Sequence, residues 1–265
     1  MTDPAPISLS VEREDHVLIL TIDRPQARNA ADADLATRMA DALDEADQDR
    51  DVRCVVITGS GDKAFCAGAD LKGIGRGEFP LPAGREHYGF AGVTQHPTSK
   101  PLIAAVNGMA LGGGAEIVLA CDLAVAAESA TFGLPEVKRG LIAAAGGVFR
   151  LPEQVPTKVA LRMMLTGEPI GAEEALRWGF VNEVVPDGQA LDAALRLAAA
   201  IASNAPLAVQ ASKRLAWGKV DGEITREQQS WERNQAEMTA IVGSSDVQEG
   251  VLAFIEKRPP AWTAS

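Results

Sequence analysis

The sequence predicts an α/β fold, in which parallel strands covered by helices form a body and further helices form the C-terminal part. Short segments that are apolar throughout, such as residues 54–58 and 102–106, alternate with helical patterns in the first two-thirds of the chain. Strands that are apolar on both faces are typical of parallel sheets buried under helices. After about residue 152 the apolar patterns have the helical period, with one strong strand pattern at residues 181–185.

The elements of the body follow from local patterns. Residues Val17–Ile22 are a β-branched run that ends at a turn-like Asp-Arg-Pro. Apolar residues then recur at spacings of 4, 4 and 3 residues with acidic residues between them, which predicts an amphipathic helix. This helix carries Leu35, Met39, Leu43 and Ala46. The same reading predicts strands at 54–58, 102–106 and 123–126, and a helix at 115–120.

The rest of the chain is mostly helical in pattern. Helices are predicted at residues 159–165, 173–178, 191–201, 206–217, 224–241 and 247–257. We therefore divide the chain into an α/β core, residues 1–200, and a helical C-terminal part, residues 201–265. The segment 73–98 fits neither pattern, because it is rich in Gly and Pro and holds two of the three histidines. It is predicted to be a long mobile segment over a site.

Composition excludes several classes of protein. Of the 265 residues, 46% are hydrophobic and 23% are charged, which describes an ordinary soluble globular protein. There are 25 Lys and Arg against 36 Asp and Glu, a net charge of −11 that disfavours nucleic acid and anionic membranes as partners. The longest apolar stretch, near 190–202, contains Asp192 and Arg196, so no membrane span is predicted.

The cysteines predict a reduced protein. Their number is odd, and their spacing fits neither a disulfide framework nor a zinc site. Each lies among apolar or small residues, so we expect buried thiols at Cys54, Cys66 and Cys121. We predict a cytoplasmic location and no bound metal.

Two glycine-containing motifs are candidates for ligand binding. Residues 63–72 place small residues between an apolar strand and a helix start, where a ligand can approach the backbone closely. Residues 108–116 contain three glycines that open a helix, which exposes unpaired N–H groups suited to a phosphate or an oxyanion. Neither is a dinucleotide fingerprint or a Walker loop. The alternatives are an ordinary turn for the first motif and close helix packing for the second.

A third motif, residues 132–137, places an acidic residue after Leu-Pro in an apolar turn. This residue, Glu136, is either a partly buried carboxylate or a solvated loop residue. It lies 20 residues after Glu116, the last residue of the second motif. No single helix face can hold both carboxylates, so they meet only if the fold brings the helix start and the later turn together.

Taken in order, these motifs resemble the crotonase (enoyl-CoA hydratase/isomerase) superfamily. The resemblance covers almost the whole chain, at residues 22–25, 29–30, 64–70, 100–108, 112–116, 132–137, 146–147 and 249–259. It implies a crotonase-type spiral of ββα turns with a helical C-terminal trimerisation part. A homotrimer or hexamer is expected, and exposed apolar faces on the helical tail favour such an assembly.

The resemblance also implies the site. The substrate is an acyl-CoA thioester, with coenzyme A as part of the substrate and no other cofactor. Its carbonyl oxygen would lie between the backbone N–H groups of Ala69 and Gly113, which form an oxyanion hole. Glu116 matches the residue that activates water, and Glu136 the one that exchanges a proton with the α-carbon. The expected contacts to substrate and coenzyme A are Ala27, Ala64, Ala67, Gly68, Asp70, Leu71, Gly112, Pro135, Phe254 and Lys257.

Both glutamates together favour an enoyl-CoA hydratase, which adds water in syn fashion across a 2-enoyl-CoA double bond. Adjacent carboxylates do not both ionise readily, so one can hold a proton while the other acts as a base. The alternatives are a Δ3-Δ2-enoyl-CoA isomerase, a dehydratase of a polar 3-hydroxyacyl-CoA, and a non-catalytic acyl-CoA-binding protein. Two departures from the family pattern, Arg28 and Ala143-Ala144, could alter the acyl pocket. His87 and Tyr88 are further candidates to line that pocket.

Overall fold

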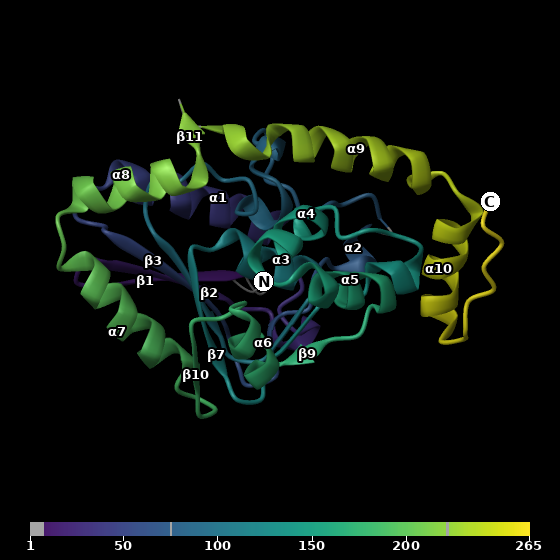
Figure 1. Ribbon diagram of the computed structural model, residues 1–265, viewed down its shortest axis with the longest axis horizontal. Coiled ribbons are helices and arrows are strands. Elements are labelled where there is room, and N and C mark those ends of the chain that lie inside the picture. Colours follow the sequence, from purple (N-terminus) through teal and green to yellow (C-terminus); the bar gives the residue numbers. More distant parts are fainter. Residues whose placement is uncertain (1–7, 75, 221–222) are drawn as a thin grey trace, which may run out of the picture.

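The computed structural model describes residues 8–74, 76–220 and 223–265. Its main sheet has six strands in the order β1-β2-β3-β5-β7-β10 (Figure 1). Only β1 is antiparallel to its neighbour, and the other pairs are parallel, as predicted. The strands are β1 (Leu9–Glu14), β2 (Val17–Ile22), β3 (Cys54–Gly59), β5 (Leu102–Val106), β7 (Leu123–Ala127) and β10 (Glu183–Val185).

The chain also forms a second sheet of four very short strands, which lie in sequence between strands of the main sheet. Its order is β4-β6-β8-β9, from β4 (Ala64–Cys66), β6 (Met109–Leu111), β8 (Thr131–Gly133) and β9 (Ile170–Gly171). Each of the first three follows a strand of the main sheet and leads toward a helix. The units are β3-β4-α2, β5-β6-α3 and β7-β8-α4, with α2 (Leu71–Ile74), α3 (Gly113–Ala120) and α4 (Gly147–Gln154). The chain thus forms the predicted spiral of ββα turns.

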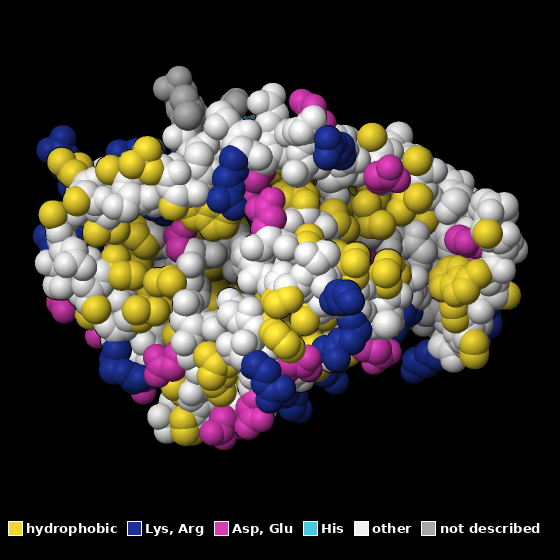
Figure 2. All heavy atoms as spheres, in the orientation of Figure 1, with side chains coloured by type: hydrophobic (Ala, Val, Ile, Leu, Met, Phe, Trp, Pro, Cys, Tyr) yellow, Lys and Arg dark blue, Asp and Glu magenta, His cyan; other side chains and the backbone are white. Residues whose placement is uncertain are grey.

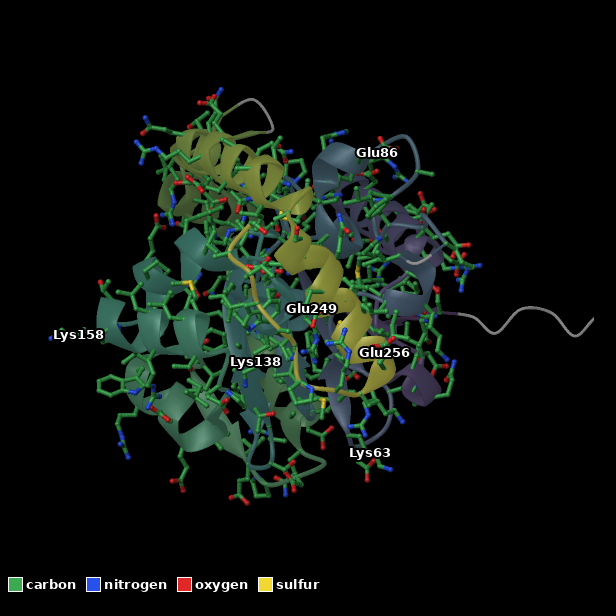
Figure 3. The ribbon with its side chains drawn as sticks, turned by 90° about the vertical axis from the view of Figure 1, so that its right-hand side faces the viewer. Lys63, Glu86, Lys138, Lys158, Glu249 and Glu256 are labelled. Carbon is green, nitrogen blue, oxygen red and sulfur yellow. The ribbon has the colours of Figure 1, made fainter. Side chains whose placement is uncertain are left out.

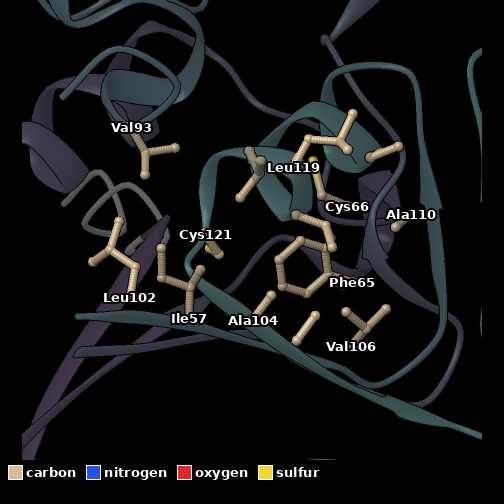
Figure 4. Packing of buried hydrophobic residues seen from close by; sticks show 14 of the residues in the cluster. Ile57, Phe65, Cys66, Val93, Leu102, Ala104, Val106, Ala110, Leu119 and Cys121 are labelled. Atoms are coloured by element: carbon tan, nitrogen blue, oxygen red, sulfur yellow. The ribbon is translucent and has the colours of Figure 1, made fainter. Parts of the chain in front are cut away.

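The core lies between these layers. Helix α1 (Ala33–Gln48) begins at Asp32, whose side chain accepts a hydrogen bond from Leu35 N, and it buries the predicted apolar face. Phe65 of β4 and Leu119 of α3 are among the fully buried side chains at the centre (Figure 4). The three cysteines are buried and free, as predicted. Gly114 shows how closely α3 approaches β4, because a Cβ there would lie 1.9 Å from the carbonyl oxygen of Cys66.

The later helices cover the sheet and then leave it. Helix α7 (Ala190–Ala202) packs alanines on the main sheet, and the predicted boundary at residue 200 falls within it. The others are α5 (Thr157–Thr166), α6 (Ala172–Trp178), α8 (Pro206–Trp217), α9 (Gln228–Val242) and α10 (Ser245–Glu256). Helices α8 and α9 run along one side, and α10 lies at the far end (Figure 1). No helix in the described ranges is long and apolar enough to cross a membrane.

Two details differ from the predictions. The helix expected from residue 224 starts at 228, after a hairpin of β11 (Lys219–Val220) and β12 (Glu223–Ile224) and the 3₁₀ helix η5 (Thr225–Glu227). Helix α4 contains Pro152, which hid it from the sequence reading. Four more 3₁₀ helices are η1 (Pro25–Ala27), η2 (Glu86–Tyr88), η3 (Phe90–Gly92) and η4 (Glu136–Arg139).

The expectation of a mobile segment at 73–98 is wrong for its second half. Val93, Thr94 and His96 are buried, and η3 packs against α1. The hydroxyl of Tyr88 donates a hydrogen bond to Asp44 on that helix. Gly75, within the first half, lies outside the described residues.

Candidate active site

Two glycine turns meet where the strands of the short sheet end. The first follows β4 and the second follows β6. A Cβ on Gly68 would lie 3.0 Å from the carbonyl oxygen of Leu111 and 3.4 Å from Gly113 N, so the turns are in contact. Gly68 and Gly112 both have positive φ angles, +96° and +56°, which favour glycine. The sequence therefore allows a close backbone approach that larger residues would prevent.

This contact joins Gly113, one predicted oxyanion donor, to Gly68, the residue before the other predicted donor, Ala69. Ala69 forms an isolated parallel bridge with Ala31, in which the N–H groups of Ala31 and Asp70 are the donors. Gly113 is the first residue of α3, where N–H groups have no partner within the helix. Among the described residues, neither Ala69 N nor Gly113 N donates to another protein group. Two such N–H groups, of which that of Gly113 is at a helix start, suit an oxygen that gains negative charge.

Glu116 lies one turn further along α3 and is 3% exposed. The backbone N–H of Gly147, the first residue of α4, donates to its Oε1 atom at 2.9 Å. Burial raises the pKa of Glu116, and the charge of Glu136 raises it further. The N–H groups of Gly147 and Ala145 act in the opposite direction, because they favour the ionised carboxylate.

Glu136 is the first residue of η4 and its side chain reaches the same place. A Cβ on Gly112 would lie 2.9 Å from its Oε1 atom, so the carboxyl group lies directly over the second glycine turn. Its Oε2 atom is buried and has no hydrogen-bond partner among the described residues. Burial raises the pKa of Glu136. Two carboxyl groups in one buried place share a proton more readily than they both ionise.

An apolar cavity of about 170 Å³ opens beside this pair. Among its lining residues, Glu136 carries the one charged side chain. The others are Leu134, Val137, Ile142, Ala143, Val148, Met164 and Leu165. Ala143, one of the two departures from the family pattern, is therefore part of the cavity wall.

The structure adds two features that the sequence reading missed. The ring of Phe90, in η3, lies where a side chain on Gly113 would be, since a Cβ there would be 2.3 Å from its Cζ atom. The segment 73–98 thus does reach the site. The second feature is the turn 143–147, which holds Glu116 through backbone N–H groups. Both depend on contacts between distant segments, and no local pattern signals them.

The remaining predicted contacts fall in two places. Ala64, Ala67, Gly68, Leu71 and Gly112 lie on or beside the two glycine turns, and Pro135 precedes Glu136. Ala27 lies in η1. The carboxylate of Asp70 accepts hydrogen bonds from the N–H groups of Lys72 and Gly73 at the start of α2, and it pairs with Arg24 at 2.9 Å. Asp70 thus caps a helix, and a contact to coenzyme A stays a prediction.

Phe254 and Lys257 come from α10, which packs on η4. A Cβ on Gly250 would lie 2.4 Å from the carbonyl oxygen of Arg139, and the Arg139 guanidinium lies 4.4 Å from the Phe254 ring centre. Figure 3 shows α10 in front of this region, and Lys138 belongs to the 3₁₀ helix that it packs on. The C-terminal helix therefore contacts the 3₁₀ helix that carries Glu136, and the contacts of Phe254 and Lys257 to coenzyme A stay predictions.

Comparison with known proteins agrees with this architecture. A family model described as Enoyl-CoA hydratase/isomerase matches residues 12–265. The chain therefore belongs to that family, which confirms the resemblance, and it is an enzyme of the hydratase and dehydratase class.

Individual relatives cover the whole length. The chain is 42% identical to the carnitinyl-CoA dehydratase of Escherichia coli K12 over 258 residues, 96% of this chain and 98% of the relative. A solved structure named carnitinyl-CoA hydratase, from Mycobacterium avium, is 58% identical with a TM-score of 0.97, covering 98% of this chain and 100% of that one. An enoyl-CoA hydratase from Mycobacterium tuberculosis H37Rv is 44% identical with a TM-score of 0.76 over the same shares.

Proposed function

We propose that this enzyme catalyses the reversible hydration of a 2-enoyl-CoA thioester to the 3-hydroxyacyl-CoA. The observation that carries the proposal is a pair of neighbouring glutamates, one buried and one half-buried, beside two backbone N–H groups with no partner among the described residues. An isomerase needs one proton shuttle, whereas water addition needs a base for the water and an acid for the α-carbon. The Glu116 and Glu136 environments supply one of each.

The hydrogen bonds support one assignment of the roles. The N–H of Gly147 favours the carboxylate form of Glu116, so we assign Glu116 as the base that takes a proton from water as the oxygen bonds to the β-carbon. Glu136 has an unpartnered oxygen and is the protonated acid, so it delivers its proton to the α-carbon. The thioester oxygen becomes an enolate between Ala69 N and Gly113 N. Removing one such donor typically costs ~3–4 kcal/mol in the transition state.

The coenzyme A portion is expected to run along the backbone near Ala64 and Ala67, beside the first glycine turn. Small residues there leave the backbone open to a ligand. Lys257 ends α10, and a positive charge there suits a phosphate in a chain whose net charge is −11. Coenzyme A enters as part of the substrate in this proposal, with no separate cofactor.

A second candidate narrows the acyl group to one with a trimethylammonium end, as in carnitinyl-CoA. Two relatives, at 42% and 58% identity, are named for action on carnitinyl-CoA. In addition, the two glutamates carry one negative charge when they share a proton, and Glu136 lines the cavity, so the potential there favours a cation. The cavity walls are otherwise apolar, which suits methyl groups.

One panel of substrates tests both candidates. Crotonyl-CoA, crotonobetainyl-CoA and its uncharged isostere 5,5-dimethylhex-2-enoyl-CoA are compared through the loss of enone absorbance. Hydration of crotonyl-CoA supports the general proposal, and a kcat/KM for crotonobetainyl-CoA at least tenfold above that of the isostere supports the cationic acyl group. Equal values for the charged and uncharged pair would overturn the second candidate alone. Binding without turnover of any thioester would overturn the first.

We further propose that the chain works as a trimer or hexamer. Large apolar side chains are exposed on its C-terminal helices, including Leu207 and Leu215 on α8 and Ile255 on α10. Figure 2 shows apolar patches over α7 and α8 and around α10. Patches of this kind mark contact surfaces between proteins.

A further inference from the structure

One face of the C-terminal helical part contacts the turn that holds Glu116. Glu227, Trp231 and Asn234 follow one another at spacings of 4 and 3 residues, so they lie on one side of α9 and of the turn that precedes it. Each contacts the turn 143–147 or the first turn of α4. This face comes from a segment more than 100 residues away from Glu116 in the chain.

Asn234 contacts the turn at its centre. Its side chain is 7% exposed, and its Nδ2 group donates to the carbonyl oxygen of Ala144 at 2.8 Å. That carbonyl belongs to the same planar peptide unit as the N–H of Ala145. The same turn ends at Gly147, whose N–H donates to Glu116 Oε1 at 2.9 Å, and the Ala145 N–H also lowers the pKa of that carboxyl group. Asn234 therefore holds the turn whose N–H groups serve the candidate base.

The other two residues of the face hold α4. Arg150 and Glu227 are both 1% exposed, and their side chains form two hydrogen bonds, of 2.9 Å and 2.6 Å. Trp231 Nε1 donates to Glu227, and its ring packs on Phe149 with 4.8 Å between ring centres. These contacts fix the helix whose first residue, Gly147, donates to Glu116. The three residues thus support both sides of the turn.

The chemistry of Asn234 differs from that of a residue that only fills space. Its Oδ1 atom is buried and has no hydrogen-bond partner among the described residues. A buried polar atom without a partner is unfavourable, and an apolar side chain would fill the same place without that loss. The one hydrogen bond that the amide does make is the one to Ala144.

We propose that Asn234 is a positioning residue for Glu116, which holds the turn 143–147 so that the N–H group of Gly147 faces the carboxylate. The inference deepens the proposed function, because it rests on Glu116 as the base of the hydration. It assigns to α9 a part in the chemistry, although α9 does not itself contact the substrate cavity.

The test compares Asn234→Ala with Gln235→Ala, a matched change at the next residue, whose exposed amide donates a hydrogen bond to Thr239 on its own helix. Misplacement of the turn is expected to lower kcat by about 10- to 100-fold in Asn234→Ala, with KM changed less than threefold. Loss of the N–H group raises the pKa of Glu116, so the rising limb of the pH profile moves to higher pH. Gln235→Ala is expected to match the wild type.

Two further variants separate positioning from a general loss of structure. In a Glu116→Gln background, Asn234→Ala is expected not to lower kcat further, because Asn234 acts on the reaction through the carboxylate of Glu116, which is then absent. Asn234→Asp can donate to Ala144 only when protonated, so its activity relative to wild type should rise as the pH falls. This variant also carries the test if Asn234→Ala does not fold.

The outcomes separate a failure of the positioning role from a failure of the proposed function. If wild type hydrates enoyl-CoA and Glu116→Gln lowers that rate as expected, but Asn234→Ala retains the wild-type rate and pH profile, the positioning role is wrong. Equal losses for Asn234→Ala in both backgrounds would also overturn it. If wild type turns over no enoyl-CoA, the proposed function fails first, and urea unfolding shows whether the protein was folded.

Discussion

At the scale of single residues, the site depends on two carboxyl groups held in different ways. Glu116 receives N–H groups from the turn before α4, whereas Glu136 lies over Gly112 with one oxygen unpartnered. The sequence identified both residues and stated the condition for their meeting. It could not supply the difference between them, because Gly147 is 31 residues from Glu116 and reaches it only in the folded chain.

The raised pKa values of the two glutamates predict a bell-shaped dependence of hydration on pH. Burial raises both pKa values above those of ordinary glutamates, so kcat/KM is expected to rise with pH as the pair loses its first proton and to fall as it loses its second. Both limbs of the profile report apparent pKa values of the coupled pair of glutamates. Initial rates measured from pH 4 to 10 check this, and a flat profile across that range contradicts it.

The same pair affects stability. A carboxyl group whose pKa is raised by folding stabilises the protein only at low pH, and that contribution is lost as the pH rises through its folded-state pKa. Glu136→Gln removes this loss. We expect its melting temperature to exceed that of the wild type at pH 8 and to match it at pH 4, by thermal unfolding at both values. A melting temperature of Glu136→Gln below that of the wild type at pH 8 would mean that the ionised Glu136 does not destabilise the folded protein.

At the scale of elements, predictability followed the strength of the local pattern. Strands β2, β3, β5 and β7 are apolar throughout and were located from the sequence. Strand β1 has charged and exposed residues and was missed. The short strands β4, β6 and β8 have three residues each, too few to display a period, although the glycine turns that follow two of them were recognised.

The contact between β4 and α3 predicts a steric effect. Gly114→Ala places a methyl group against the Cys66 carbonyl, so α3 must move away from β4. Such overpacking typically costs about 1–3 kcal/mol, and the displaced Gly113 N also weakens the oxyanion hole. Urea unfolding and kcat are measured together. The control is Gly243→Ala at the end of α9, where nothing lies within 4 Å and neither quantity should change.

At the scale of the whole molecule, α8 and α10 expose large apolar side chains that a monomer would leave in contact with water. Leu215 is 84% exposed and Ile255 is 69% exposed. The composition of these helices predicted assembly without revealing which faces meet, because register between copies depends on shape. Phe254 and Lys257 lie on the same helix as Ile255, so assembly and the coenzyme A contacts are expected to be linked.

Sedimentation measures this assembly. The protein is expected to sediment at three or six times 27.8 kDa at micromolar concentration. Leu215→Glu places a charge in the apolar surface of α8 and should shift the population toward smaller species. A wild-type protein that sediments as a monomer would rule out the trimer and the hexamer together.

The account as a whole rests on the two glutamates acting in one step. The most direct measurement is the hydration rate of crotonyl-CoA for Glu116→Gln, Glu136→Gln and the double variant, with exchange of the α-proton against solvent deuterium as a second readout. Each single change is expected to lower kcat by about 10²- to 10⁴-fold. The double variant should lose less than the combined effect, and exchange should depend mainly on Glu136. Full hydratase activity in either single variant would contradict the account.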